Sequence, residues 1–168
     1  MYWIQNQHHT RLAIVPRPRG GDWLHDEARA FRRAGIDIVV SLLTQPEAGE
    51  LGLEDEREAC ESTGITFVLF SIPDRGVPAS PQSFNLLVDG LKRELLAGKS
   101  VGIHCRQSIG RSSLLAAALL CSFSSSADSA FAQIAECRGC AVPDTQEQRE
   151  WVRKFILSAA PGDKMAGI

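Results

Sequence analysis

Four short, continuous apolar runs constrain the fold of this chain more than any other feature of its sequence. They are rich in β-branched residues and do not alternate with polar residues, which is typical of strands buried on both faces of a sheet. The runs span residues 12–15, 36–43, 65–72 and 101–104. Helical patterns lie between them, so the sequence predicts an α/β fold with a central, mostly parallel sheet of four or five strands flanked by helices. A fifth strand is expected at residues 2–4, in a hairpin with residues 12–15.

The segments between and after the apolar runs carry helical signals. Leu24, Ala28 and Phe31 share one helical face, and a longer apolar stripe begins at Phe84. Proline at the start of that second helix and glycine at its end fit the usual asymmetry of helix boundaries. Further helices are expected over residues 53–63, 110–123, 127–136 and 146–157. A length of 168 residues predicts one domain spanning residues 1–168, with a frayed tail at residues 160–168.

Composition excludes several functional classes. The net charge is −2, whereas proteins that bind nucleic acid usually present a strongly basic face, so we expect no nucleic-acid partner. No apolar run is long enough to span a bilayer and the first ten residues do not resemble a secretion signal, so we expect a cytoplasmic protein without a membrane partner. Five cysteines at irregular spacing do not resemble a disulfide framework. We also expect a monomer.

The loop that follows the fourth apolar run carries a distinctive set of side chains. In an open parallel sheet, ligands bind beyond the carboxyl ends of the strands, which is where Cys105 and Arg111 fall. Backbone N–H groups of a short strand-to-helix loop can surround a tetrahedral oxyanion, and the helix N-terminus adds a positive end. The guanidinium of Arg111 can bind two phosphate oxygens, and the same positive surroundings favour the thiolate of Cys105. The loop therefore predicts a nucleophile at the base of a phosphate-binding cup, lined by Arg106, Gln107, Ser108, Ile109 and Gly110.

A second loop supplies a candidate acid. Cleavage of a phosphate ester needs a proton on the leaving oxygen, and Asp74 follows the third apolar run. Gly76 lies between two prolines in the same loop, which suits a lid that closes over a substrate. Ser112 is placed to stabilise the thiolate that departs when water hydrolyses a cysteinyl-phosphate.

Residues 104–112 resemble the signature loop of the cysteine-based protein tyrosine and dual-specificity phosphatases. Residues 72–78 resemble the mobile general-acid loop of that superfamily, and residues 138–148 its downstream glutamine-containing segment. The compact size is similar to that of prokaryotic members and of the cyclin-dependent-kinase-associated type. The resemblance implies a protein tyrosine phosphatase-like fold without a metal or other cofactor. It also implies roles for particular residues: Cys105 as nucleophile, Arg111 as phosphate clamp, Asp74 as acid and base, Ser112 as hydroxyl helper, and His104 as a structural influence on the thiolate.

Two positions depart from the pattern of the superfamily. Ser108 stands where glycine is usual, and the serine either strains the loop or contributes another donor. Asp144 stands where a glutamine commonly positions water, whereas Gln148 retains the later glutamine. Both Asp144 and Gln148 are therefore supporting candidates for orienting the hydrolytic water.

Three functions are compatible with these residues. The first is hydrolysis of phosphotyrosine, and also phosphoserine or phosphothreonine, in a phosphorylated protein. The second uses the same chemistry on an inositol phosphate, a phosphoinositide or an RNA 5′ phosphate, and is motivated by Arg106, Arg17 and Arg19. The third is a phosphate-binding module that has lost turnover, motivated by Ser108 and Asp144.

Two other clusters have simpler interpretations. Cys137 and Cys140 have the spacing of a redox or zinc pair, but no second pair completes a zinc site and no strand precedes them. The acidic residues among positions 47–58 are expected to form a solvated stretch.

Overall fold

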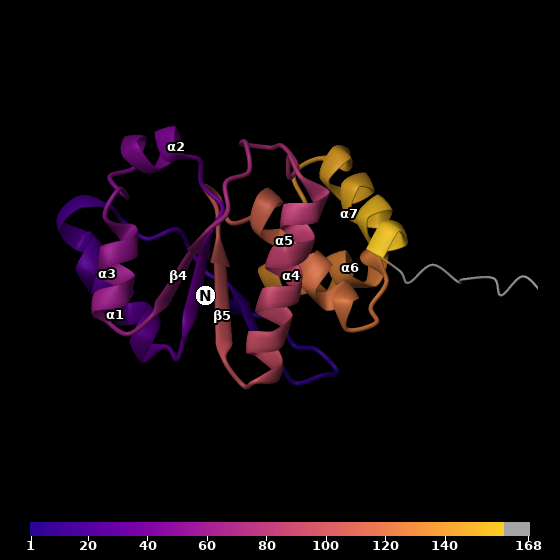
Figure 1. The fold of residues 1–168 in the computed structure, drawn as a ribbon, viewed down its shortest axis with the longest axis horizontal. Coiled ribbons are helices and arrows are strands. Elements are labelled where there is room, and N and C mark those ends of the chain that lie inside the picture. The colour runs from indigo at the N-terminus through magenta and orange to yellow at the C-terminus, as the bar shows by residue number, and fades with distance from the viewer. Residues whose placement is uncertain (160–168) are drawn as a thin grey trace, which may run out of the picture.

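A single five-stranded sheet forms the centre of the computed structural model, which describes residues 1–159 (Figure 1). The strand order is β1-β2-β5-β3-β4; only β1 runs antiparallel to its neighbour, β2. The strands are β1 (Tyr2–Trp3), β2 (Arg11–Ile14), β3 (Ile38–Ser41), β4 (Thr66–Leu69) and β5 (Ser100–His104). The mostly parallel sheet and the starting hairpin are therefore confirmed. The expected frayed tail at residues 160–168 lies outside the described residues.

Helices cover both faces of the sheet (Figure 1). They are α1 (Leu24–Arg33), α2 (Gln45–Glu50), α3 (Glu56–Ser62), α4 (Pro81–Leu96), α5 (Gly110–Ser122), α6 (Ala127–Arg138) and α7 (Gln146–Ala159). Helices α1 and α3 lie on one side, and α4 to α7 lie on the other. None of the helices in residues 1–159 has both the length and the apolar character needed to cross a bilayer.

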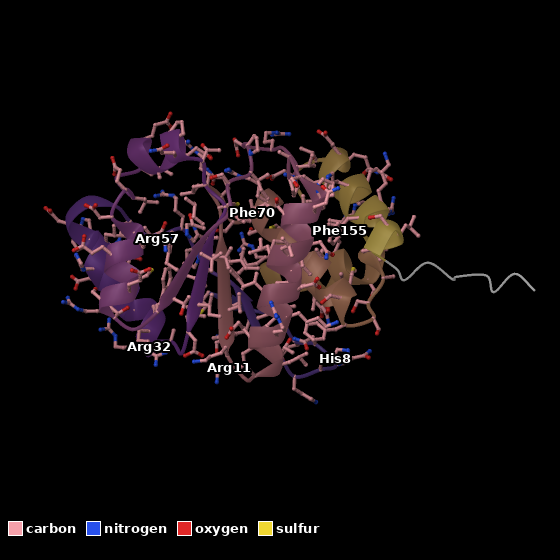
Figure 2. All side chains as sticks on the ribbon, viewed as in Figure 1. His8, Arg11, Arg32, Arg57, Phe70 and Phe155 are labelled. Carbon is pink, nitrogen blue, oxygen red and sulfur yellow. The ribbon has the colours of Figure 1, made fainter. Side chains whose placement is uncertain are left out.

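Two apolar cores result from this layering. The smaller core lies between the sheet and helices α1 and α3. It contains Phe31, Phe67 and the strand side chains that face these two helices. The larger core is centred on Phe84, whose ring packs edge-on against Phe70 and Phe155 at centroid distances of 5.8 and 5.1 Å. Figure 2 shows Phe70 near the sheet and Phe155 among the helices beyond α4. Burial on both faces explains why the strands read as continuous apolar runs.

Helix α5 is buried on every side. All residues from Gly110 to Leu120 are buried, because the helix packs against β2 and β5 on one side and α4, α6 and α7 on the others. A helix in this position must be apolar around its whole circumference, which explains the absence of an amphipathic pattern in this segment. Its first turn therefore lies within the core, directly after the end of β5.

The four parallel strands β2, β3, β4 and β5 all end at the same edge of the sheet. The loops after them carry the candidate residues, whereas Arg11 and Arg32 lie at the opposite edge (Figure 2). One of these loops differs from expectation, because residues 45–50 form α2. Thr44 caps this helix by accepting a hydrogen bond from the backbone N–H of Glu47, whose carboxylate accepts from the backbone N–H of Thr44 at 3.0 Å.

Candidate active site

The loop between β5 and α5 holds Cys105 at the end of a fully buried strand. Cys105 is 2% exposed, and its Sγ lies 3.7 Å from the hydroxyl oxygen of Ser112 in the first turn of α5. Cys105 and Ser112 are seven positions apart in the sequence, and the reversal from strand to helix brings them together. The structure therefore places a hydroxyl group directly beside the thiol, which donates to its oxygen.

The guanidinium of Arg111 is held by a buried carboxylate. Glu47 accepts two parallel hydrogen bonds from Arg111 Nη1 and Nη2, each 2.8 Å long. The backbone carbonyl of Ile72 accepts a further bond from Nη1 at 2.8 Å. Arg111 is 1% exposed, and a charge so far from water is stable only when it is paired and fully hydrogen-bonded.

These contacts shift the pKa of both partners. Hydrogen bonds from Arg111 lower the pKa of Glu47 from 4.5 to about 2, although burial acts in the opposite direction. Burial lowers the pKa of Arg111, but the hydrogen bond to Glu47 and the nearby charge of Cys105 outweigh it, so the net shift is upward. Glu47 and Arg111 are therefore a permanent ion pair at the carboxyl edge of the sheet.

Asp74 reaches the same guanidinium from a different loop. Its Oδ1 accepts a hydrogen bond of 2.9 Å from Arg111 Nη2, while its side chain remains 57% exposed. With this bond, both N–H groups of Nη2 have an acceptor. Both Nη atoms of Arg111 thus have hydrogen-bond partners, whereas its Nε has none among the described residues.

The Asp74 loop is attached to helix α7. Gln148, which is buried, donates a hydrogen bond from Nε2 to the carbonyl of Gly76 at 3.0 Å. The Oε1 atom of Gln148 has no partner within residues 1–159. Asp144 lies against the start of α5, because a Cβ added at Gly110 would be 2.1 Å from Asp144 Oδ2. The structure thus brings both supporting candidates to the same end of α5.

His104 is buried at the last position of β5. Its Nε2 lies 2.8 Å from Oε1 of Glu56, which is also buried. Glu47 and Glu56 therefore contradict the expectation of a solvated acidic stretch, whereas Glu50, Glu54 and Glu58 are exposed as expected. Glu47 faces Arg111, and this ion pair compensates the desolvation of the carboxylate, whereas Glu56 faces His104.

The remaining loop residues point in different directions. The guanidinium of Arg106 is turned toward α2, where it lies 3.0 Å from Glu50 and 4.0 Å from Glu47. Gln107 is exposed and Ile109 is half-buried. Ser108 adopts a left-handed φ of 53°, yet its hydroxyl donates to the carbonyl of Val15 at 2.8 Å, away from the loop interior. The serine therefore adopts the glycine-like conformation and adds a tether to β2.

Sequence reasoning missed one contributor to the site, Glu47. The local signal was present, since Thr44 and Glu47 have the spacing of a helix capping box with proline between them. No local sequence pattern indicates the contact between Glu47 and Arg111, because the two residues are 64 positions apart.

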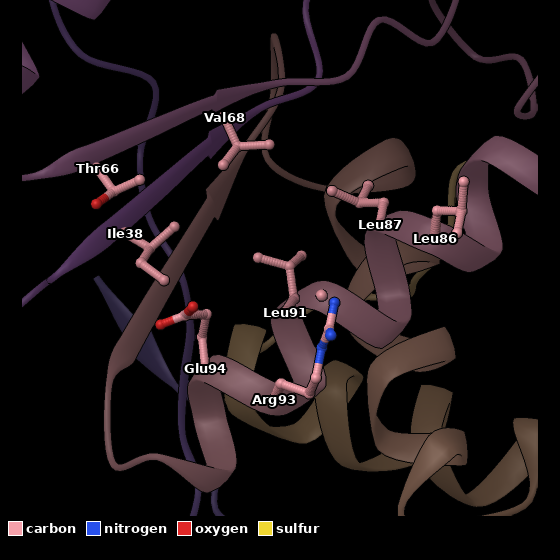
Figure 3. Close-up of a pocket in the computed structure, with 9 residues that line it drawn as sticks. Ile38, Thr66, Val68, Leu86, Leu87, Leu91, Arg93 and Glu94 are labelled. Atoms are coloured by element: carbon pink, nitrogen blue, oxygen red, sulfur yellow. The ribbon is translucent and has the colours of Figure 1, made fainter.

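The described residues contain no cluster of three or more potential metal ligands. A groove of about 620 Å³ lies away from the candidate loops, between the edge strand β4 and helix α4 (Figure 3). Its lining includes Thr66, Val68, Leu87 and Leu91, and it contains none of the predicted site residues. We therefore assign the chemistry to the carboxyl edge of the sheet and not to this apolar groove.

Comparison of the sequence with models of known families gives a match. Residues 15–124, which contain both candidate loops, match the family described as "Polymorphic toxin system, DSP-PTPase phosphatase". The chain belongs to this phosphatase family. A comparison with curated protein sequences gives no match.

Solved phosphatase structures share the fold of this chain. A kinase-associated phosphatase, KAP, with its catalytic cysteine replaced by serine superposes with a TM-score of 0.78 at 22% identity, covering 88% of this chain and 85% of KAP. Tk-PTP in its active form gives a TM-score of 0.69 at 27% identity, covering 88% and 92%. PTPMT1 gives a TM-score of 0.73 at 18% identity, covering 94% of each chain.

Proposed function

We propose that this DSP-PTPase hydrolyses phosphate monoesters on proteins through a phosphocysteine intermediate, with phosphotyrosine as substrate and phosphoserine or phosphothreonine also accepted. The observation that carries this proposal is the convergence of Cys105, Arg111 and Asp74 at one edge of the sheet, from the loops after β5 and β4. Family membership supports the class of reaction.

In the proposed first step, the thiolate of Cys105 attacks phosphorus, and the bond from phosphorus to the ester oxygen breaks. The proton comes from Asp74, which must leave the guanidinium of Arg111 to reach the leaving oxygen. Its departure frees one N–H of Nη2 beside the unpartnered Nε–H of Arg111. Two adjacent N–H groups form the fork that binds two phosphate oxygens. In this proposal Asp74 occupies part of the phosphate site until substrate displaces it.

In the second step, water attacks phosphorus and gives its proton to the carboxylate of Asp74. The bond from sulfur to phosphorus breaks, and the hydroxyl of Ser112, 3.7 Å from Sγ, donates to the departing thiolate. Gln148 is suited to orient the water, because its buried Oε1 has no hydrogen-bond partner among residues 1–159 and lies near Gly110. The Nε2 of the same side chain holds the Asp74 loop through Gly76.

A protein substrate is favoured over a highly charged inositol phosphate because two basic side chains at this edge of the sheet, Arg106 and Arg19, are already paired. Arg106 contacts Glu50 at 3.0 Å, and Arg19 contacts Glu27 at 2.6 Å and lies over the ring of Trp23. A polyphosphorylated ligand would have to break these pairs.

Hydrolysis of p-nitrophenyl phosphate in EDTA tests the chemistry. We expect Cys105→Ser to abolish turnover, while Cys60→Ser, at a buried cysteine of α3, leaves it intact. Full turnover by Cys105→Ser would refute the assignment of the nucleophile. Rates on phosphotyrosine and phosphoserine peptides, measured beside inositol phosphates, test the substrate class; preference for inositol phosphates would refute the protein substrate.

A further inference from the structure

Arg138, at the end of α6, contacts the loop that is proposed to bind phosphate. Its Nε donates a hydrogen bond of 3.0 Å to the backbone carbonyl of Ser108. The contact joins residues 30 positions apart and approaches the loop from the outside, on the side of α6. None of the proposed catalytic steps uses this side chain.

The orientation of the Ser108 carbonyl decides where the next N–H group points. A trans peptide is planar, so the C=O of residue 108 and the N–H of Ile109 point in opposite directions. Arg138 holds the carbonyl outward, toward α6. The N–H of Ile109 must therefore point the other way, toward the interior of the loop, where an oxyanion would accept its hydrogen bond.

Two contacts fix the same residue from opposite sides. The hydroxyl of Ser108 donates to the carbonyl of Val15 at 2.8 Å, and the carbonyl of Ser108 accepts from Arg138. Ser108 has a φ of 53°, which side chains other than glycine rarely adopt and which external contacts must maintain. Arg138 and Val15 together supply those contacts.

Arg138 is itself held in place without being neutralised. Its guanidinium lies 4.0 Å from the centroid of the Tyr2 ring on β1, and no carboxylate of residues 1–159 lies within 4.0 Å of it. An unpaired cation bonded to a carbonyl polarises that peptide, which strengthens the hydrogen bond its N–H group can donate. The arginine thus adds positive character to the loop without touching the bound anion.

We propose that Arg138 is a positioning residue that orients and polarises the Ser108–Ile109 peptide for oxyanion binding. The proposal rests on the proposed phosphatase function of the loop. It assigns a role to the segment between Cys137 and Cys140, whose spacing alone indicated only a redox or zinc pair.

Binding of inorganic phosphate, measured by calorimetry and as competitive inhibition, tests the proposal. Arg138→Met keeps an unbranched side chain but removes the donor, and we expect it to weaken phosphate binding about tenfold and to raise KM more than it lowers kcat. Arg138→Lys retains charge and a donor, so we expect it to recover part of the affinity.

Arg57 offers a matched control on the other side of the sheet (Figure 2). It also donates to a backbone carbonyl, that of Phe67 at 3.3 Å, and lies over an aromatic ring. We expect Arg57→Met to change thermal stability about as much as Arg138→Met but to leave phosphate affinity within about twofold.

The outcomes separate this inference from the proposed function. If the wild type binds and hydrolyses phosphate compounds but Arg138→Met binds phosphate equally well, the positioning role is refuted and the phosphatase function stands. If Arg138→Met does not fold, Arg138→Leu, which also lacks a donor, makes the same test, with the same expected loss. A wild type that neither binds phosphate nor hydrolyses esters would overturn both proposals.

Discussion

Replacing Glu47 by glutamine removes one charge from the ion pair that holds Arg111. The guanidinium is 1% exposed and would keep, of its two carboxylate partners, Asp74, which is partly solvated. Removing one partner of a buried pair typically costs about 3 to 5 kcal/mol, because the other charge stays buried without compensation. The pKa of Glu47 gives a similar figure, since a shift from 4.5 to about 2 corresponds to roughly 3 kcal/mol.

The pH dependence follows from the direction of this shift. The pKa of Glu47 is lower in the folded state, so the stabilisation is complete above about pH 4.5 and is lost as the pH falls toward 2. We therefore expect Glu47→Gln to lower the free energy of unfolding by about 3 kcal/mol at pH 7, and by roughly half of that or less at pH 3. Urea unfolding followed by tryptophan fluorescence at pH 7, 5, 4 and 3 measures the difference.

Glu50→Gln is the matched control, because Glu50 lies on the same helix and pairs with the exposed Arg106. Its side chain is 61% exposed, so we expect a change within about 0.5 kcal/mol at every pH. We also expect Glu47→Gln to lower kcat/KM at least tenfold, since a loosened Arg111 binds phosphate less well. A stability loss in Glu47→Gln that equals that of Glu50→Gln, or that does not change with pH, would refute the buried-pair reasoning.

Three further predictions concern the acid, the backbone and the thiols. Asp74→Asn should lower kcat on phosphotyrosine peptides by about 10²-fold or more; unchanged kcat would exclude Asp74 as the acid. Gly102→Ala should lower the free energy of unfolding by about 1 to 3 kcal/mol, because the added Cβ would lie 2.9 Å from the side chain of Val15. Gly90→Ala in α4 should instead stabilise the protein by up to about 1 kcal/mol, because the added Cβ meets no atom within 4 Å. Equal melting temperatures of the two variants would contradict both predictions. Burial raises the pKa of Cys60 and of Cys121 to about 12, so iodoacetamide at pH 8 should alkylate the exposed Cys140 before either of them, as mass spectrometry of tryptic peptides can show; early labelling of Cys60 would argue against its burial.

The strands and long helices were predictable because each leaves a local pattern in the sequence. Strands buried on both faces give continuous apolar runs, and α4 combines an apolar stripe with Pro81 at its first position and a glycine beyond its end. Helix α2 was not predicted, although the sequence contains its capping box. The helix has only six residues, and they include a proline and a glycine, which are also common in loops.

The candidate site was predictable only in part, for a physical reason. Cys105 and Arg111 lie in one continuous loop, so their proximity follows from chain connectivity. Glu47 and Arg138 reach that loop from 64 and 30 positions away, and such contacts depend on how helices pack after the sheet forms. A sequence contains no local mark of these partners, which is why Glu47 was assigned to a solvated stretch.

The complete burial of α5 has a consequence for how the enzyme tolerates heat. The first turn of this helix is continuous with the loop, and its remaining turns are surrounded by packed side chains. Such a loop cannot soften independently, since any displacement would have to move the interior of the molecule with it. Anion affinity and tertiary structure should therefore disappear in one cooperative transition, without an inactive but still folded form at intermediate temperature.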